Sequence, residues 1–354
     1  MVKKIKICKI YNKNKKKRYI TLKKERDNLF RNYNELLNNS FCDKKGIYFL
    51  NDTSLNLHLG CKTVVKNIKA CCESNNLKII FYDRNYGNLP NSCKNYHDYI
   101  DIIKKADILL FNGEGTLHDS RGVDMLEKCK LAKDLNKKLV LFNTVWQNNK
   151  DIEKYLEMFD IIAARESISA KEMQKITKKR IEIVPDMTFY SDRIIKEEKT
   201  RQIIFTDSVK NNITNELYEI AKKLNCPFYF FTSGLKSKYV NQNYITEDII
   251  ASLSPNSLIV TGRFHMLTFA LKYGIPAIAI PSNTHKMEGL LKDADLEEYL
   301  IKETDNFEEK IQEFLNKNHD LYYKNSEIYS ANAKEKIENL FKQIQFITNQ
   351  EQRK

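Results

Sequence analysis

The sequence predicts an α/β protein with two Rossmann-like parallel-sheet domains that face each other across a cleft, followed by C-terminal helices. Short, continuously apolar segments alternate with segments of helical length, which is typical of parallel strands covered by helices on both faces. The alternation stops at a polar stretch over residues 191–202 and then restarts, which indicates a second domain. The length of 354 residues also suits two domains.

In the first domain, apolar runs predict strands and periodic segments predict the helices between them. The expected strands are 46–50, 77–82, 106–112, 138–143, 160–164 and 181–184. The expected helices are 61–74, 97–105, 123–136 and 167–177. The third of these helices rests on apolar residues at Val123, Leu126, Leu131 and Leu135, which share one helical face.

The second domain repeats the pattern. Strands are expected at 202–206, 228–231, 257–261 and 276–280, and helices at 214–224, 248–252 and 265–273. The tail from about residue 306 reads as charged helices whose apolar residues pack back on a core, namely Ile311, Phe314, Leu315, Ile337, Leu340, Phe341 and Ile344. We therefore divide the chain into a basic arm and helix (1–44), two Rossmann-like domains (45–192 and 193–305) and a helical extension (306–354).

The basic residues are unevenly distributed along the chain. The formal net charge is +13, but 12 of the 59 basic residues and two of the 46 acidic residues lie within 1–27. The rest of the chain is nearly balanced, so the charge argues against nucleic acid as a partner. Two explanations of the arm stay open: compositional bias, and attachment to an anionic membrane surface at about 1 kcal/mol per charge.

The cysteine pattern and the targeting signals predict a cytoplasmic protein, peripheral to the inner membrane face if the arm attaches it there. None of the eight cysteines forms a Cys-x-x-Cys pair and no histidine has finger-like spacing, so we expect reduced, mostly buried thiols and no metal site. The charged N-terminus lacks the apolar stretch of a signal peptide. No apolar run approaches the roughly 18–20 residues of a membrane-spanning helix.

Polar residues that could do chemistry follow the predicted strands, where ligands of parallel sheets bind. In the loop 112–118, Gly113, Gly115 and Thr116 would allow an anion to bind close to the backbone amides. Glu114 in the same loop could be a general base. The alternative is a simple tight turn with an exposed glutamate. His118 and the earlier loop residues Asn56 and His58 carry no specific signal alone; together with Asp186 they are the candidates for binding the acceptor.

Two further strand ends carry arginine. Arg263 offers two donors to a phosphate or carboxylate, and His265 can bind an anion or donate a proton. Arg165 follows a strand in the same way, although pairing with Glu166 would also explain it. Ser167 reads as a helix N-cap, and Asp186, near the domain switch, as a site residue or a cap.

In this order and spacing the motifs resemble the polysaccharide pyruvyl transferase family over about residues 45–300, and the resemblance implies a GT-B-like pair of Rossmann-like domains. The set comprises Asn56…His58-Leu-Gly60, Asn112-Gly-Glu-Gly115, Ala164-Arg-Glu-Ser167, Val184-Pro-Asp186, Gly262-Arg-Phe-His265, Ala270-Leu-Lys-Tyr-Gly-Ile-Pro276 and Ser282-Asn-Thr-His-Lys286. The resemblance implies that Arg165, Arg263 and His265 bind phosphoenolpyruvate. In the family the glycine loop is commonly a run of glycines, and Glu114 replaces the middle one here.

The resemblance implies a capsule or exopolysaccharide enzyme that moves a pyruvyl group to a sugar of a glycan or lipid-linked precursor, forming a ketal. Its chemistry would use Glu114 as acceptor base, His265 as proton donor and Lys286 at the donor phosphate, with no permanently bound cofactor. One alternative is a glycosyltransferase with a CMP- or UDP-sugar donor, because some cell-surface GT-B enzymes share the layout. Another is a non-enzymatic sugar- or anion-binding regulator on the same fold.

Overall fold

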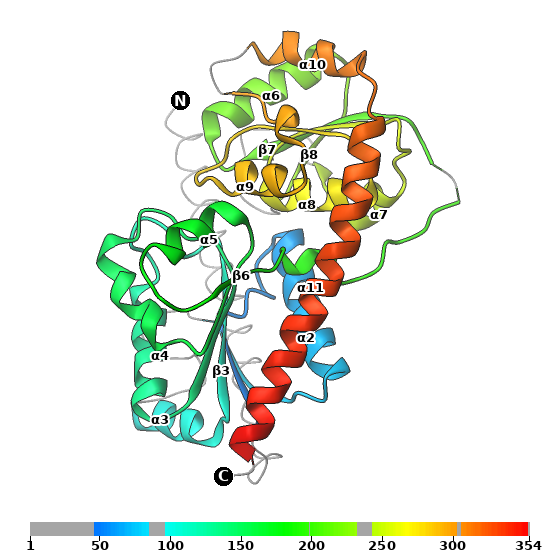
Figure 1. The fold of residues 1–354 in the computed structure, drawn as a ribbon. Coiled ribbons are helices and arrows are strands. Elements are labelled where there is room, and N and C mark those ends of the chain that lie inside the picture. The colour runs from blue at the N-terminus through cyan, green and yellow to red at the C-terminus, as the bar shows by residue number, and fades with distance from the viewer. Residues whose placement is uncertain (1–45, 85–95, 198, 232–242, 303–305, 353–354) are drawn as a thin grey trace, which may run out of the picture.

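The computed structural model describes residues 46–84, 96–197, 199–231, 243–302 and 306–352. The predicted basic arm lies outside these residues. Within the described part, two parallel sheets with surrounding helices form two domains, which confirms the predicted fold class (Figure 1).

The first sheet has six parallel strands. They are β1 (Ile47–Leu50), β2 (Ile79–Asp83), β3 (Ile108–Glu114), β4 (Lys138–Thr144), β5 (Ile161–Ala164) and β6 (Ile181–Ile183). Their order is β2-β1-β3-β4-β5-β6, so the chain reverses its direction across the sheet between β1 and β3. In open parallel sheets such a switch point leaves a crevice at the carboxyl ends of the two strands.

Helices cover both faces of this sheet, as the continuous apolar strands predict. They are α2 (Leu59–Ser74), α3 (Tyr96–Lys105), α4 (Val123–Asp134) and α5 (Ser167–Gln174), with 3₁₀ helices η1 (Lys150–Met158) and η2 (Met187–Phe189). Side chains of β1 alternate between two hydrophobic clusters: Phe49 shares one with Val64 of α2, and Leu50 shares the other with Leu126 of α4. The period-2 alternation of a strand therefore builds a core on each side.

The second sheet has five parallel strands. They are β7 (Ile203–Ser208), β8 (Phe228–Phe230), β9 (Asn243–Tyr244), β10 (Leu258–Gly262) and β11 (Ala277–Ala279). Their order is β11-β10-β7-β8-β9, which places a second switch point between β7 and β10. The surrounding helices are α6 (Asn211–Lys223), α7 (Glu247–Ala251), α8 (Phe264–Tyr273), α9 (Lys286–Asp293), η3 (Glu297–Tyr299) and α10 (Phe307–Leu315).

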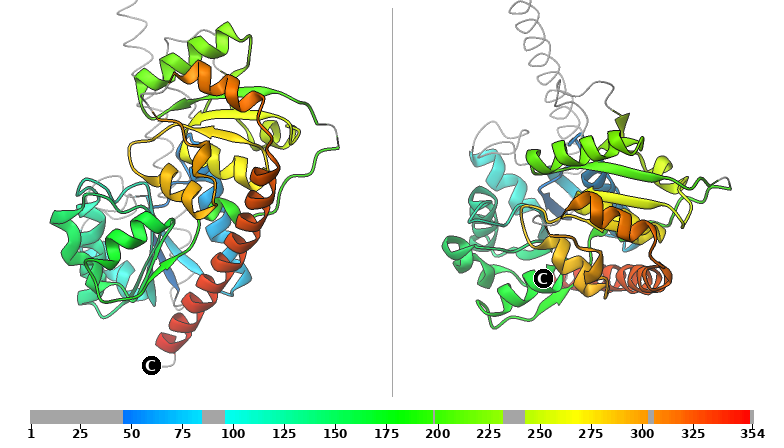
Figure 2. Two further views of the ribbon diagram at one scale, coloured as in Figure 1. Left: turned by 45° about the horizontal axis from the view of Figure 1, so that its top comes forward. Right: turned by 90° about the horizontal axis from the view of Figure 1, so that it is seen from above.

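The two domains contact each other through α5, α8, α9 and η2 (Figure 2). The amide of Ser167 donates to Asp293 Oδ2 at 2.8 Å, and the hydroxyl of Thr188 donates to that of Thr268 at 2.9 Å. Residues 264–272 of α8 are all buried, because this helix lies between its own sheet and the first domain. The carboxyl ends of the strands of both sheets therefore meet at the interface between the two domains.

The last helix, α11 (Asp320–Gln352), runs along both domains (Figure 1). In its first half, the hydroxyl of Tyr323 donates to the carbonyl of Pro255 in the second domain at 2.9 Å. In its second half, the Phe341 ring packs edge-on against Phe142 of β4, with 5.9 Å between the ring centroids. All seven apolar tail residues expected to pack inward are wholly or partly buried.

Three features differ from the sequence predictions. The predicted turn at 113–116 starts later, because β3 continues through Glu114 and pairs with Thr144 of β4. The strand β9, the helix α9 and the 3₁₀ helix η1 were not predicted; each is short, and α9 and η1 carry several charged side chains. Glu166, rather than Ser167, caps α5, because its carboxylate accepts the amides of Ile168 and Ser169.

Candidate active site

The candidate site lies where the two switch points face each other across the domain interface. The first supplies the end of β3 and the chain after β1, and the second supplies Asp207 at the end of β7 and Arg263 directly after β10. Arg165 follows β5, and Lys286 opens α9. Chain segments far apart in the sequence thus bring several charged side chains together.

Arg165 is held deep in the domain interface. It is only 2% exposed, its Nη1 lies 3.4 Å from Asp186 Oδ2, and its guanidinium carbon lies 4.1 Å from the centre of the Phe264 ring of the second domain. Arg165 does not pair with Glu166, the alternative that the sequence left open, because the Glu166 carboxylate faces the start of α5. The Nε of Arg165 has no hydrogen-bond partner among the described residues.

Asp186 is both a cap and a site residue. Its Oδ1 accepts the amide of Thr188 at 3.0 Å, and its Oδ2 lies 3.7 Å from His265 Nε2 as well as near Arg165. Complete burial acts to raise the pKa of this carboxyl, but the adjacent His265 and Arg165 and the Thr188 amide hold it well below its usual range. Asp186 is therefore a buried anion beside the His265 ring, although the two make no direct hydrogen bond.

Besides Arg165, the positively charged side chains of the candidate site are Arg263 and Lys286. Arg263 pairs closely with Asp207, yet its Nε has no partner among the described residues, and its side chain is 16% exposed. Lys286 Nζ donates to Asn283 Oδ1. Burial, reinforced by the positive charges of Arg165 and Arg263, lowers the pKa of Lys286 to about 7. Arg165 and Arg263 therefore lie close enough to Lys286 for their charges to disfavour its protonated form.

Glu114 is buried at the end of β3, not exposed in a turn. Its Oε1 accepts hydrogen bonds from the Thr53 hydroxyl and, at 2.9 Å, from Asn112 Nδ2. Its Oε2 lies 3.3 Å from the sulfur of Cys61, which donates to it. Three of the roughly four acceptor positions of this carboxylate are therefore used, and one on Oε2 remains for an acceptor hydroxyl.

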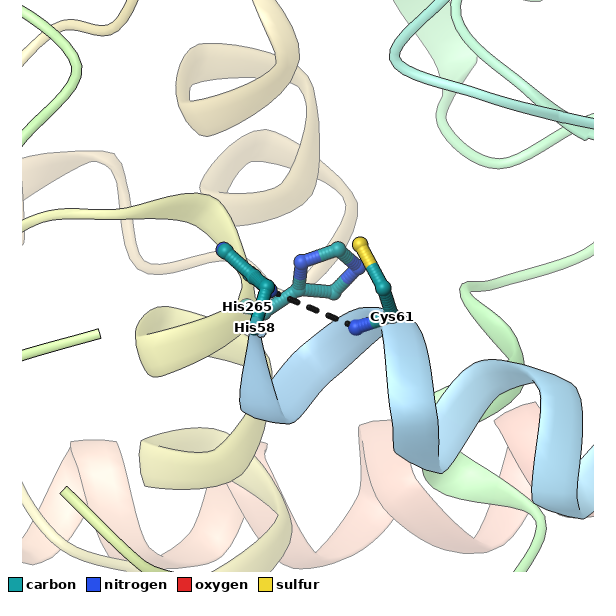
Figure 3. A group of neighbouring side chains, drawn as sticks. All are labelled: His58, Cys61 and His265. Atoms are coloured by element: carbon teal, nitrogen blue, oxygen red, sulfur yellow. Dashed lines mark hydrogen bonds between the residues drawn. The ribbon is translucent and has the colours of Figure 1, made fainter. Parts of the chain in front are cut away.

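His58 and Cys61 lie at the start of α2, against His265 of α8 (Figure 3). His58 Nδ1 accepts the amide of Cys61 at 3.3 Å and so caps the helix. Burial, together with the positive charges of His265, Arg263 and Lys286, lowers the pKa of His58 to about 2, so the ring is neutral near pH 7. Burial and the neighbouring Glu114 raise the pKa of the Cys61 thiol.

The glycines of the site differ in what they permit. A Cβ at Gly113 would meet the Thr144 side chain at 2.4 Å, so this glycine is needed for strand packing. Gly115 is exposed, and a Cβ there would touch only Arg165 Nη2, at 3.7 Å. Thr116 is half-buried, and its Oγ1 lies 3.5 Å from Asn51 Nδ2. Of the two glycines in the predicted anion loop, Gly115 is the one open to a ligand.

The remaining predicted residues lie at the margin of the site. Asn56 is exposed, and it is close enough to Cys61 to influence that thiol. His118 is buried; its Nδ1 lies 2.8 Å from Asp119 Oδ2, and its Nε2 lies 3.4 Å from Asn283 Nδ2 of the second domain. His118 thus connects indirectly to Lys286 through Asn283.

Sequence reasoning missed two residues that the structure places at the site. Asp207, the partner of Arg263, ends an apolar strand, which is the same signal that pointed to Arg263 and Arg165. Cys61 carried no such signal: it looked like one of several buried thiols, and only the packing of α2 on α8 brings it next to His265.

Solved structures share this architecture. A putative UDP-N-acetylglucosamine 2-epimerase from Listeria monocytogenes superposes with a TM-score of 0.50 at 10% identity, over 83% of this chain and 94% of its own. A functionally uncharacterised protein from Klebsiella pneumoniae gives 0.47 at 14% identity (77% and 98% coverage), and the glycotransferase of kitacinnamycin gives 0.48 at 7% (87% and 99%). At such identities the likeness concerns the fold alone, two parallel-sheet domains in a GT-B-like arrangement.

The chain belongs to the polysaccharide pyruvyl transferase family, whose model matches residues 4–284. It is therefore a transferase. The match begins at residue 4, so it also covers the basic arm, which the motif resemblance over 45–300 had left out. Comparison with the curated proteins gives no significant match. Among the described residues, no helix is long and apolar enough to cross a membrane.

Proposed function

We propose that this transferase takes a pyruvyl group from phosphoenolpyruvate and forms a ketal on a sugar of a surface polysaccharide or its lipid-linked precursor. One observation carries the proposal: Arg165, Arg263 and Lys286 converge at the domain interface, and the Nε atoms of both arginines lack hydrogen-bond partners among the described residues. Buried donors without partners are costly, and an anion with a phosphate and a carboxylate would satisfy them.

In this proposal the cations differ in role. Arg263 is the more exposed arginine and contacts the donor directly, with Lys286 beside it. Arg165 is almost fully buried. It acts on the donor through the part of its guanidinium group that lies near Gly115. The charge of the bound donor would raise the pKa of Lys286, so that binding recruits a proton to this lysine near neutral pH.

His265 is the proposed proton donor. Asp186 faces its Nε2, which leaves Nδ1 as the nitrogen available to a reactant. A proton moves to the methylene carbon of phosphoenolpyruvate while a sugar hydroxyl, losing its proton to Glu114, adds to C2. A second hydroxyl of the sugar then displaces phosphate from C2 and closes the ketal: its proton passes to His265, which restores the proton donor, and phosphate leaves with the electron pair of the broken C–O bond.

Ligand-dependent thermal unfolding tests the donor. We expect phosphoenolpyruvate to raise the melting temperature of the full chain, and Arg263→Ala to abolish this shift. Arg180→Ala serves as a matched control, because this exposed arginine precedes β6 and so lies at the amino end of the first sheet, opposite the candidate site. CMP- and UDP-sugars form the second arm of the test. Stabilisation by a nucleotide sugar but not by phosphoenolpyruvate would overturn the proposal and support the glycosyltransferase.

Release of inorganic phosphate in the presence of acceptor glycans measures the reaction itself. His265→Ala should lose turnover while keeping most of the donor-induced stabilisation, because the arginines remain. Glu114→Gln should also lose turnover, since the amide accepts no proton. Wild-type turnover in both variants would contradict these roles.

A further inference from the structure

The contact between α5 and α9 lies next to two cations of the candidate site. Arg165 comes two residues before Ser167, where α5 begins, and Lys286 is the first residue of α9. The two helices belong to different domains and pack against each other (Figure 1). The position of Arg165 relative to Lys286 therefore depends on how these two helices pack.

One side of α9 makes this contact. His285, which precedes the helix as its N-cap residue, is followed at intervals of four by Gly289 and Asp293, so the three lie on one side. A Cβ built on Gly289 would overlap the Glu166 carboxylate. Asp293 Oδ2 accepts the amide of Ser167 at 2.8 Å. The side of α9 that faces the first domain is therefore closely packed on the N-terminal end of α5.

The first domain holds His285 at its backbone and at its side chain. The backbone amide donates to Gln147 Oε1 at 2.9 Å. The ring Nε2 lies 3.2 Å from Ser169 Oγ and 3.5 Å from Glu166 Oε1. Ser169 Oγ also accepts the amide of Trp146, the neighbour of Gln147, at 2.8 Å, so both contacts belong to one hydrogen-bonded unit. The start of α9 is thus fixed to the first domain, although α9 belongs to the second.

We propose that His285 and Gln147 are positioning residues, which hold Lys286 at a fixed position relative to Arg165 so that the two cations match the anionic groups of the donor. The inference rests on the proposed function, because it takes these cations to bind phosphoenolpyruvate. The phosphate and carboxylate of one small molecule lie a short distance apart. Their cationic partners bind them best when they are already held at a matching distance.

Donor binding and the contact between α5 and α9 are coupled in this proposal. A donor bound between Arg165 and Lys286 joins the same two chain segments that His285 joins, so each favours the other, and by linkage the coupling is reciprocal. Such couplings typically change affinity about 5- to 150-fold. Because the hydrogen bond between Asp293 and Ser167 remains when His285 is replaced, we expect an effect near the lower end, about 10-fold.

Amide hydrogen exchange of the full chain tests the contact without any donor, so this outcome is independent of the proposed function. In His285→Ala and in Gln147→Ala we expect faster exchange at the start of α9 and also at the start of α5, in the other domain, because the two ends open together. His285→Gln should restore slow exchange, since its amide nitrogen can take the place of Nε2. Unchanged exchange at the start of α5 in both alanine variants would overturn the proposal.

Calorimetric titration with phosphoenolpyruvate tests the effect on the donor. His285→Ala and Gln147→Ala should each weaken binding about 10-fold, and His285→Gln should restore most of the affinity. In phosphate release we expect a higher KM for phosphoenolpyruvate with little change in kcat, because saturating donor restores the position of Lys286. A residue that served stability alone would not change KM selectively. Thermal unfolding of each variant verifies that it is folded.

His319→Ala is the matched control. This half-buried histidine also directly precedes a helix of the second domain, α11, but it lines a cavity together with Ile203 and Leu258, the first residues of β7 and β10. It therefore lies at the opposite end of the sheet from the candidate site and should bind the donor like the wild type.

The two measurements separate the possible failures. A wild-type protein that does not bind phosphoenolpyruvate would contradict the proposed function, while hydrogen exchange still decides whether His285 fixes α9 to α5. Wild-type donor affinity in His285→Ala, with exchange at the start of α5 clearly faster, would overturn the positioning role and leave the proposed function intact.

Discussion

Replacement of Gly60 by alanine tests how closely the two domains pack at the site. Gly60 lies in the first turn of α2, and a Cβ built on it falls 2.1 Å from His265 Cγ and 2.4 Å from His265 Cβ. Carbon atoms in contact prefer about 3.5–4.0 Å. Rotating the His265 ring cannot relieve the clash with His265 Cβ, so α2 and α8 must separate by about 1 Å or more.

Overpacking of this kind costs about 1–3 kcal/mol. For Gly60→Ala we expect a melting temperature lower by about 2–4 °C per kcal/mol, if the whole chain unfolds as one unit. We also expect turnover about 100-fold lower, because a misplacement of about 1 Å at reacting groups has that effect. Differential scanning calorimetry and phosphate release measure the two effects.

Two further variants make the reasoning specific. Gly115→Ala should leave the melting temperature unchanged, because its Cβ would make only an ordinary contact at 3.7 Å. His265→Ala removes the ring but not Cβ, so the double variant with Gly60→Ala should be less unstable than the sum of the single variants. A Gly60→Ala protein with wild-type melting temperature and turnover would show that the domains do not pack as described.

Further predictions concern the charged groups and α11. Asp186→Asn leaves a buried arginine without its anion, so the free energy of unfolding in denaturant should fall by about 3–5 kcal/mol; an unchanged midpoint would argue against the pair. Affinity for phosphoenolpyruvate, measured by calorimetry, should fall as pH rises above about 7, because Lys286 loses its charge there, and Lys286→Arg should remove this dependence. His285 helps to lower the pKa of the buried Glu166 carboxyl, whose stabilising effect disappears as pH falls; His285→Ala should therefore move acid unfolding, followed by circular dichroism, to higher pH. Leu340→Ala should destabilise the protein by about 2–5 kcal/mol in the same denaturant assay, since its side chain is fully buried, whereas exposed Phe346 provides a control substitution with little effect.

Local patterns were sufficient for the strands and most helices, because each apolar run and each helical period records burial at its own position. The run 106–112 became β3, and the periodic segment after Val123 became α4. Patterns fail where an element is short and charged: Lys286 was expected at a phosphate, but the helix that it begins was not expected.

Contacts between residues far apart in the sequence were harder to predict than the positions of strands and helices along the chain. Pairing with Glu166 was the alternative explanation for Arg165, yet Asp186, 21 positions away, is its partner, because parallel strands β5 and β6 end side by side. The contact of Cys61 with His265 depends on how two separate domains pack, and no local spacing contains that information.

The position of α11 has a consequence for synthesis on the ribosome. Phe341 and Leu340 cover part of the first domain, yet they are translated about 150 residues after its last strand, β6. At roughly 5–20 residues per second, the surface around Phe142 stays uncovered for about 8–30 s. During that time the nascent first domain exposes an apolar surface to other chains, so we expect its folding yield to depend on translation speed and on chaperones that shield such surfaces.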